Sequence, residues 1–208
     1  MVSAPQLGVL ALQGAVAEHV RALRDCGAQV RTVRRPAELA GLDGLVVPGG
    51  ESTTMARLAG PVGLFPAVRA AHEDGMAVFG TCAGLILLAE DVADASALTG
   101  YDRIGGLDVT VRRNGYGSQL DSFSAALPVT GLREPLPAVF IRAPVIERAG
   151  ADVEVLAEHR GAPVAVRQGR LLGASFHPEL TADRRLHGLF AEIAAAGDRP
   201  RAMEPAGA

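Results

Sequence analysis

The first half of the chain alternates short apolar runs with segments in which apolar residues recur at helical spacing. The apolar runs are rich in branched side chains and end at turn residues, which is typical of buried strands. We predict strands over residues 7–12, 29–33, 45–47 and 76–79, and helices over 15–26, 52–58, 62–73 and 85–93. Strands that alternate with helices in this way usually pair in parallel and are covered on both faces. The pattern therefore predicts an α/β fold with a mostly parallel, doubly wound sheet and a flavodoxin-like core.

The second half of the chain has a different pattern, in which short strands follow one another with turn residues between them. We predict strands over residues 107–111, 138–141, 153–157, 164–166 and 171–176, and a last helix over 182–196. These strands would extend the sheet and add antiparallel strands to it. We expect residues 1–197 to form a single domain, and the Pro-, Ala- and Gly-rich segment 198–208 to be disordered.

The composition excludes several classes of protein. The 208 residues, 49% of them apolar and 21% charged, suit one domain with a full core. A net charge of −3, with no basic cluster among aromatic residues, gives no reason to expect nucleic acid. We find no signal peptide, no stretch that could span a bilayer and no zinc-like His/Cys cluster, and two cysteines make a poor disulfide framework. We therefore expect a cytoplasmic protein without a metal or cofactor.

Residues 80–84 have the form G-x-C-x-G between a predicted strand and a predicted helix. In this position a sharp turn lifts a nucleophile out of the sheet, and glycines on both sides let neighbouring elements approach closely. The thiol of Cys82 would lie at a helix N-terminus, which favours its thiolate, and the N–H of Ala83 would face a developing oxyanion. The alternative is a cysteine that only fills space, and we accept that interpretation for Cys26.

A thiol nucleophile needs a base, and the base needs a group that holds its ring. Of the five histidines, His19, His72 and His187 lie in predicted helices and are expected at the surface or its boundary, and His159 lies before a turn. His177 differs because it directly follows an apolar strand and precedes Pro178 and Glu179. In an extended segment residues i and i+2 share a face, so the carboxylate could orient the imidazole. The alternative is a strand-end turn with a solvated glutamate.

Together these blocks resemble the triad-type, or class I, glutamine amidotransferases: P-G-G-E-S-T-T at 48–54, F-G-T-C-A-G at 79–84 and S-F-H-P-E-L-T at 175–181. The closer resemblance is to the glutaminase subunit of pyridoxal 5′-phosphate synthase, the PdxT/SNO family. It rests on further blocks at residues 8–19, 111–123 and 139–144 and covers the chain from about residue 7 to residue 190. Six blocks in the same order are much more specific than one G-x-C-x-G.

The resemblance implies a role for each matched residue. Cys82 would be the nucleophile, and His177 and Glu179 would complete the triad. The residues implied in glutamine binding are Gly50, Glu51, Ser52, Arg113, Ile141 and Arg142, and those implied in the oxyanion hole are Gly50 and Ala83. Either arginine could pair with the substrate carboxylate, but both could instead form surface charge pairs. Glu51 could equally be a helix-cap acid.

The resemblance also implies a reaction and a partner. The chain would hydrolyse L-glutamine to glutamate and ammonia, without a cofactor or metal, and pass the ammonia to a (β/α)₈-barrel synthase subunit within a multi-subunit complex. We further expect Gln13 and Gly14 to lie beside Gly49 and Gly50, where a peptide flip could complete the oxyanion hole. The alternatives are a subunit of another class I amidotransferase, a non-catalytic binding module, and a cysteine hydrolase of γ-glutamyl peptides.

Overall fold

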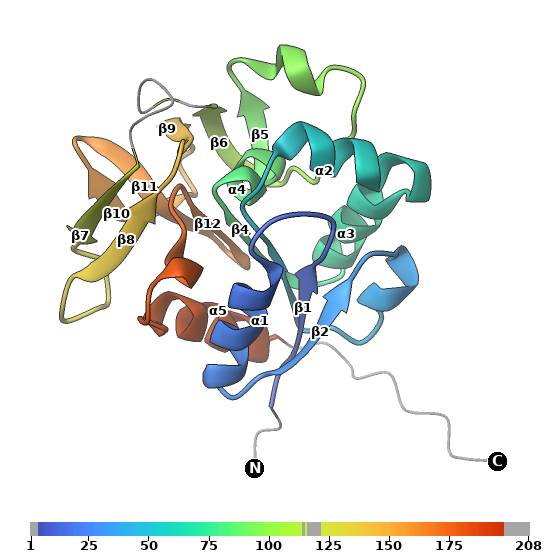
Figure 1. The fold of residues 1–208 in the computed structure, drawn as a ribbon, viewed down its shortest axis with the longest axis horizontal. Helices are drawn as coiled ribbons and strands as arrows, with labels where there is room; N and C mark the ends of the chain where they lie inside the picture. Colours follow the sequence, from blue (N-terminus) through green and yellow to red (C-terminus); the bar gives the residue numbers. More distant parts are fainter. Residues whose placement is uncertain (1–3, 114, 116–121, 198–208) are drawn as a thin grey trace.

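The computed structural model describes residues 4–113, 115 and 122–197. Its centre is a seven-stranded sheet in the order β10-β11-β12-β4-β3-β1-β2 (Figure 1). The strands are β1 (Gln6–Leu10), β2 (Gln29–Val33), β3 (Gly44–Val47), β4 (Ala77–Thr81), β10 (Glu154–His159), β11 (Ala162–Gln168) and β12 (Leu171–Ala174). The segment 198–208, which we predicted to be disordered, lies outside the described residues.

The parallel part of the sheet determines where a ligand can bind. Strands β2, β1, β3, β4 and β12 run parallel to one another, whereas β11 is antiparallel to β12 and β10 is antiparallel to β11. This is the flavodoxin-like order, which reverses direction between β1 and β3. In open sheets of this kind, ligands bind beyond the carboxyl ends of the strands at that point. The predicted fold class is confirmed.

The two faces of the sheet bury separate apolar clusters, because successive side chains of a strand point to opposite faces. In β3, Leu45 and Val47 belong to one cluster and Val46 to the other. The first cluster is covered by helices α2 (Ser52–Ala59), α3 (Leu64–Glu73) and α4 (Ala83–Leu88), and the second by α1 (Val16–Asp25) and α5 (Arg185–Ala195) (Figure 1). No described helix is long and apolar enough to cross a membrane.

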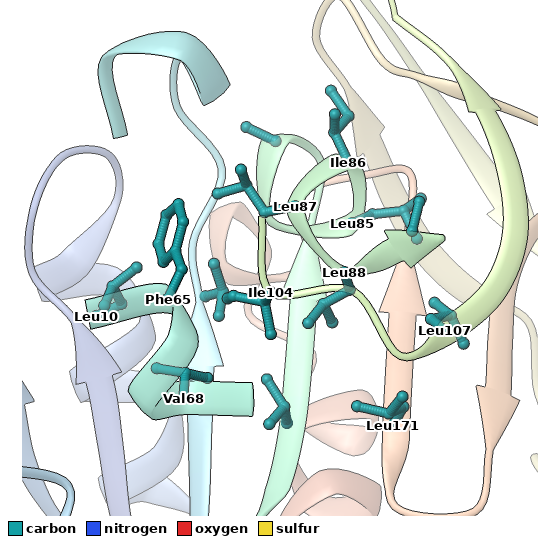
Figure 2. Packing of buried hydrophobic residues seen from close by; sticks show 14 of the residues in the cluster. Leu10, Phe65, Val68, Leu85, Ile86, Leu87, Leu88, Ile104, Leu107 and Leu171 are labelled. Atoms are coloured by element: carbon teal, nitrogen blue, oxygen red, sulfur yellow. The ribbon is translucent and has the colours of Figure 1, made fainter. Parts of the chain in front are cut away.

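Helix α4 is buried along its whole length in the first cluster. All six of its residues are buried, and Figure 2 shows its side chains Leu85, Ile86, Leu87 and Leu88 among side chains from several other elements. Phe65 and Val68 of α3 and Leu171 of β12 are among these neighbours. A helix that is apolar on every side can only be stable inside a core. The segment after Cys82 is therefore held in place by the core.

The prediction of one helix over residues 85–93 is wrong. Helix α4 ends at Leu88, and the chain continues as β5 (Ala89–Val92), which pairs in parallel with β6 (Leu107–Arg112). Ala89 already has an extended backbone with ψ of 139°. Pairing with β6 provides the hydrogen bonds that the helix would otherwise have supplied, so tertiary structure outweighs the helical preference of the run.

Two short strands missed by the sequence analysis lie beside the central sheet. β9 (Val145–Ala149) is antiparallel to β6, and β7 (Phe123–Leu127) forms an antiparallel pair with β8 (Leu136–Phe140). The β7–β8 pair lies at the side of the molecule where β10 and β11 end the sheet (Figure 1). The N–H of His177 donates to the carbonyl of Val139 at 2.8 Å, so β8 carries Ile141 and Arg142 to the end of β12.

Candidate active site

Cys82 occupies a strained turn between β4 and α4. Its φ of 49° and ψ of −105° are unusual for a residue with a side chain, and such a conformation costs about 1–3 kcal/mol. Its N–H donates to the carbonyl of Ala174 at 2.8 Å, which ties the turn to β12. A Cβ added to Gly84 would lie 1.9 Å from the carbonyl oxygen of Val47, so the elbow needs a glycine there. The structure thus has the sharp strand–helix turn that G-x-C-x-G predicts.

His177 and Glu179 lie just beyond the end of β12. His177 Nδ1 lies 2.8 Å from Glu179 Oε1, and the Glu179 side chain is completely buried. The two residues are not brought together by an extended segment, because Pro178–Leu180 form a 3-10 turn (η4). The prediction that an extended segment brings Glu179 to the ring of His177 is therefore wrong, although the predicted contact is present. The proline starts the turn, and the turn aims the carboxylate back at the ring.

The imidazole of His177 lies against the elbow. A Cβ added to Gly49 would approach His177 Cε1 at 2.4 Å and Cys82 Cβ at 3.3 Å, so the ring and the cysteine border the same point of the β3 turn. Burial lowers the pKa of His177, but hydrogen bonds to Cys82 and Glu179 and the charges of both groups outweigh it and raise the pKa to about 10. The ring is therefore protonated at neutral pH when it faces a thiolate.

A pocket of about 270 Å³ opens in front of the sulfur. It lies beyond the carboxyl ends of β1, β3 and β4, at the reversal in strand order. Its lining residues are Gln13, Gly50, Glu51, Ser52, Cys82, Ala83, Ile86, Arg113, Ile141, Arg142 and His177. All the residues predicted to bind glutamine, and both predicted to form the oxyanion hole, thus lie around one cavity. Glu179 is behind His177 instead of on the pocket wall. The size suits a small ligand such as an amino acid.

Glu51 both caps a helix and faces the pocket. As the N-cap of α2, its carboxylate accepts hydrogen bonds from the N–H groups of Thr53 and Thr54 at 3.2 and 2.6 Å. Burial raises the pKa of Glu51, but these hydrogen bonds outweigh it and lower the pKa. Arg113 Nη2 lies 3.4 Å from Glu51 Oε1. The two interpretations of Glu51 are thus compatible, and Arg113 forms a charge pair inside the pocket.

The opposite wall comes from the loop after β8. The Cys82 sulfur lies 3.8 Å from the carbonyl oxygen of Ile141, and Arg142 has a left-handed backbone with φ of 45°. On the third side, Gln13 Oε1 accepts the N–H of Glu51 at 2.9 Å. The turn after β1 therefore lies beside the Gly49–Gly50 turn, as expected from the strand order.

The sequence analysis missed the residues behind the triad. His19 and His187 were expected at the surface or its boundary, but both are fully buried. His19 Nε2 lies 3.2 Å from Thr81 Oγ1 and 3.4 Å from Glu179 Oε2. The signal that could have revealed them is that α1 and α5 cover the same face of the sheet, so that a histidine on either helix can point inward.

The arrangement is suited to acyl transfer from an amide. A thiol on an elbow, an imidazole beside it and a buried carboxylate behind the ring have the spatial arrangement of a catalytic triad. No group of three or more His, Cys, Asp or Glu side chains that could hold a metal ion occurs in the described part of the chain. Fold and site together define the class of triad-type glutamine amidotransferases.

Comparison with known proteins identifies the group within that class. The chain belongs to the SNO glutamine amidotransferase family, whose model matches residues 9–195. It is 60% identical over 193 residues to the pyridoxal 5′-phosphate synthase subunit PdxT of Parafrankia sp. (strain EAN1pec), covering 92% of this chain and 94% of the relative. It is 56% identical over 191 residues to the PdxT subunit of Mycolicibacterium vanbaalenii, covering 91% and 97%.

Solved structures agree with the fold. A crystal structure described as a glutamine amidotransferase superimposes with a TM-score of 0.85 at 49% identity, covering 90% of this chain and 98% of that one. The structure of PurLQS from Thermotoga maritima superimposes with a TM-score of 0.61 at 16% identity, over 93% of this chain and 96% of the matched one. At that identity the second structure supports the fold alone.

Proposed function

We propose that the chain is the glutaminase subunit of pyridoxal 5′-phosphate synthase and supplies ammonia for vitamin B6 biosynthesis. Membership of the SNO family and the shared name of its relatives support this function. The observation that carries the chemistry is the position of His177, which contacts Cys82 and Glu179 and has a pKa raised to about 10. The proposed partner is a (β/α)₈-barrel synthase subunit in a cytoplasmic complex.

The first half-reaction breaks the amide. The Cys82 thiolate attacks the side-chain amide carbon of glutamine, and the N–H groups of Gly50 and Ala83 hold the resulting oxyanion. The thiolate charge is one cause of the raised pKa of His177, so that pKa falls when the sulfur bonds to carbon. His177 then gives its proton to the leaving nitrogen, and ammonia departs from a glutamyl thioester.

The second half-reaction restores the enzyme. Neutral His177 takes a proton from water, the hydroxide attacks the thioester carbon, and glutamate leaves as the sulfur regains its charge. The ring is again an imidazolium beside a thiolate. The side chain of Glu179 accepts the hydrogen of His177 Nδ1 and so holds the ring in place. No step uses a cofactor or a metal.

Substrate binding uses the charged groups of the pocket. The α-carboxylate of glutamine would pair with a guanidinium, and Arg113 is the better placed because its side chain is only 17% exposed and already faces Glu51. Glu51 would then pair with the α-ammonium group. Both charges of an amino acid would thus meet opposite charges, with the side chain directed at Cys82.

The proposal is tested by measuring ammonia release from glutamine with and without a purified barrel synthase. We expect turnover that requires Cys82 and rises when the synthase is added. Equal turnover in both cases would contradict activation by the partner, and the peptide flip at Gly49 and Gly50 with it. Hydrolysis of γ-glutamyl peptides in preference to glutamine would favour the rival hydrolase.

A further inference from the structure

A row of buried polar side chains continues behind the triad. His19 of α1 and His187 of α5 are both fully buried, and His19 Nδ1 lies 3.0 Å from His187 Nε2. The other ring nitrogen of His19 lies 3.2 Å from Thr81 Oγ1 and 3.4 Å from Glu179 Oε2. Thr81 Oγ1 in turn accepts the N–H of Gly49 at 3.1 Å. His19 thus lies between the triad carboxylate and the turn that forms the predicted oxyanion hole.

The charge state of the row follows from its surroundings. Burial, His187 and His177 all lower the pKa of His19 well below its usual value. Burial and Arg184 lower the pKa of His187 to about 4. Both rings are therefore neutral at pH 7, and each carries one N–H. The charged or titratable groups that face His19 are His177, Glu179 and His187.

The unpaired atoms decide which nitrogen carries each hydrogen. Glu179 Oε2 and His187 Nδ1 are buried without a hydrogen-bond partner of ordinary geometry among the described residues. If His19 carried its hydrogen on Nδ1, its Nε2 lone pair would face the carboxylate, and His187 Nδ1–H would be a buried donor without an acceptor. With the hydrogen on Nε2 of both rings, His187 donates to His19, and His19 Nε2–H points toward Thr81 Oγ1 and Glu179 Oε2. Only this arrangement turns an N–H, instead of a lone pair, toward the side of His19 where the second carboxylate oxygen lies.

We propose that His19 is a positioning residue: its Nε2–H holds Oε2 of Glu179 and the hydroxyl of Thr81, and so fixes the triad carboxylate relative to the Gly49 turn. This inference rests on the proposed catalytic roles of Cys82, His177 and Glu179. A neutral donor fits the place, because a second cation behind Glu179 would compete with His177 for its charge. An apolar side chain would leave the carboxylate oxygen buried and unpaired.

Two amide substitutions separate this role from simple packing. In His19→Gln the side-chain amide reaches the position of Nε2 and can donate to Glu179. In His19→Asn the amide reaches only the position of Nδ1, so it keeps a contact with His187 but leaves Oε2 without a donor. Asparagine and glutamine are both neutral amides. The comparison therefore tests where the donor lies.

The measurement is kcat and KM for ammonia release from glutamine, with the synthase subunit present. We expect His19→Asn to lower kcat about 10- to 100-fold with little change in KM, and His19→Gln to stay within about threefold of the wild type. His72→Asn is the control, because that half-buried histidine of α3 bonds the carbonyl of Met76 away from the site. It should have wild-type kcat.

A second readout does not depend on turnover. The rate at which iodoacetamide alkylates the protein is followed against pH, with Cys82→Ala measured to subtract reaction at Cys26. A misplaced carboxylate stabilises the His177 imidazolium less and so lowers its raised pKa. In His19→Asn the alkaline limb of the alkylation profile, where the imidazolium loses its proton, should therefore move down by about 1 pH unit. A variant that only packs less well would lower the melting temperature without moving this limb.

The outcomes distinguish the inference from the function it rests on. If His19→Asn matches His19→Gln in kcat and in the alkylation profile while the wild type depends on Cys82, the positioning role of His19 is wrong and the triad stands. If Cys82→Ala still releases ammonia, the proposed triad is wrong and the inference falls with it. If His19→Asn does not fold, His19→Gln alone decides, because a kcat more than about tenfold below the wild type would contradict the role of the Nε2 donor.

Discussion

The pocket side and the buried side of the triad differ in solvent exposure and in the number of charged groups. On the pocket side, Glu51 and Arg113 have side chains 41% and 17% exposed, and they carry full charges that water or a substrate can satisfy. On the buried side, His19 and Glu179 have side chains with no exposure, and Glu179 carries the only formal charge of that row. Its charge therefore acts on His177 without competition. We therefore propose that the exposed side binds the substrate and that the buried side controls the reactivity of His177.

The largest effect on activity is expected at Cys82, where the pocket side and the buried side of the triad meet. Cys82→Ala removes the nucleophile and should lower ammonia release by more than about 1000-fold, because no other group of the pocket can form the thioester. The side chain is small, so the melting temperature should change little. A variant that kept a tenth of the wild-type rate would contradict the role of Cys82.

The next largest effect on activity is expected for Glu179, on the buried side of the triad. Glu179→Gln keeps the shape but removes the charge that helps to raise the pKa of His177 from 6.5 to about 10. We expect kcat to fall about 100- to 1000-fold, and the alkaline decline of kcat/KM to move to lower pH. The pH–rate profile measures both. An unchanged alkaline limb would show that the carboxylate does not act on the ring.

A smaller effect is expected on the pocket side. Arg113→Ala should raise KM for glutamine about 10- to 100-fold and leave kcat within about threefold, because a carboxylate contact is made equally in the ground and transition states. Arg142→Ala is the matched comparison, since that side chain is exposed. A larger rise in KM for Arg142→Ala would reverse the assignment of the two arginines.

The smallest effect on activity, and a distinct effect on stability, is expected at the end of the buried row. The unfolded chain protonates His187 near pH 6.5, but the folded chain does so only near pH 4, so between these values the unfolded state binds more protons. The contribution of His187 to the free energy of unfolding is therefore fully present above pH 6.5. It falls as the pH is lowered, by about 3 kcal/mol at most. His187→Phe should therefore lose less unfolding free energy than the wild type between pH 6.5 and pH 4 in denaturant titrations. Equal losses would contradict the neutral, buried pair.

The sequence predicts the pocket side well because its determinants are local. The glycines at residues 80 and 84, and those at 49 and 50, mark turns at strand ends, and parallel strands bring such ends to one edge. The buried side could not be predicted in this way. His19 and His187 lie far apart in the chain, and their burial depends on how α1 and α5 pack on the sheet. Likewise, only pairing with β6 explains why the helical pattern after Leu88 becomes a strand.

The two cysteines of the chain allow the most direct test of the central claim, because only Cys82 lines the pocket. The chain, with its synthase partner, is treated with a chloroketone analogue of glutamine, and the modified peptides are identified by mass spectrometry. We predict one label, on Cys82, whose formation L-glutamine prevents. A label on Cys26, or a label on Cys82 that glutamine does not prevent, would contradict a glutaminase site at this elbow.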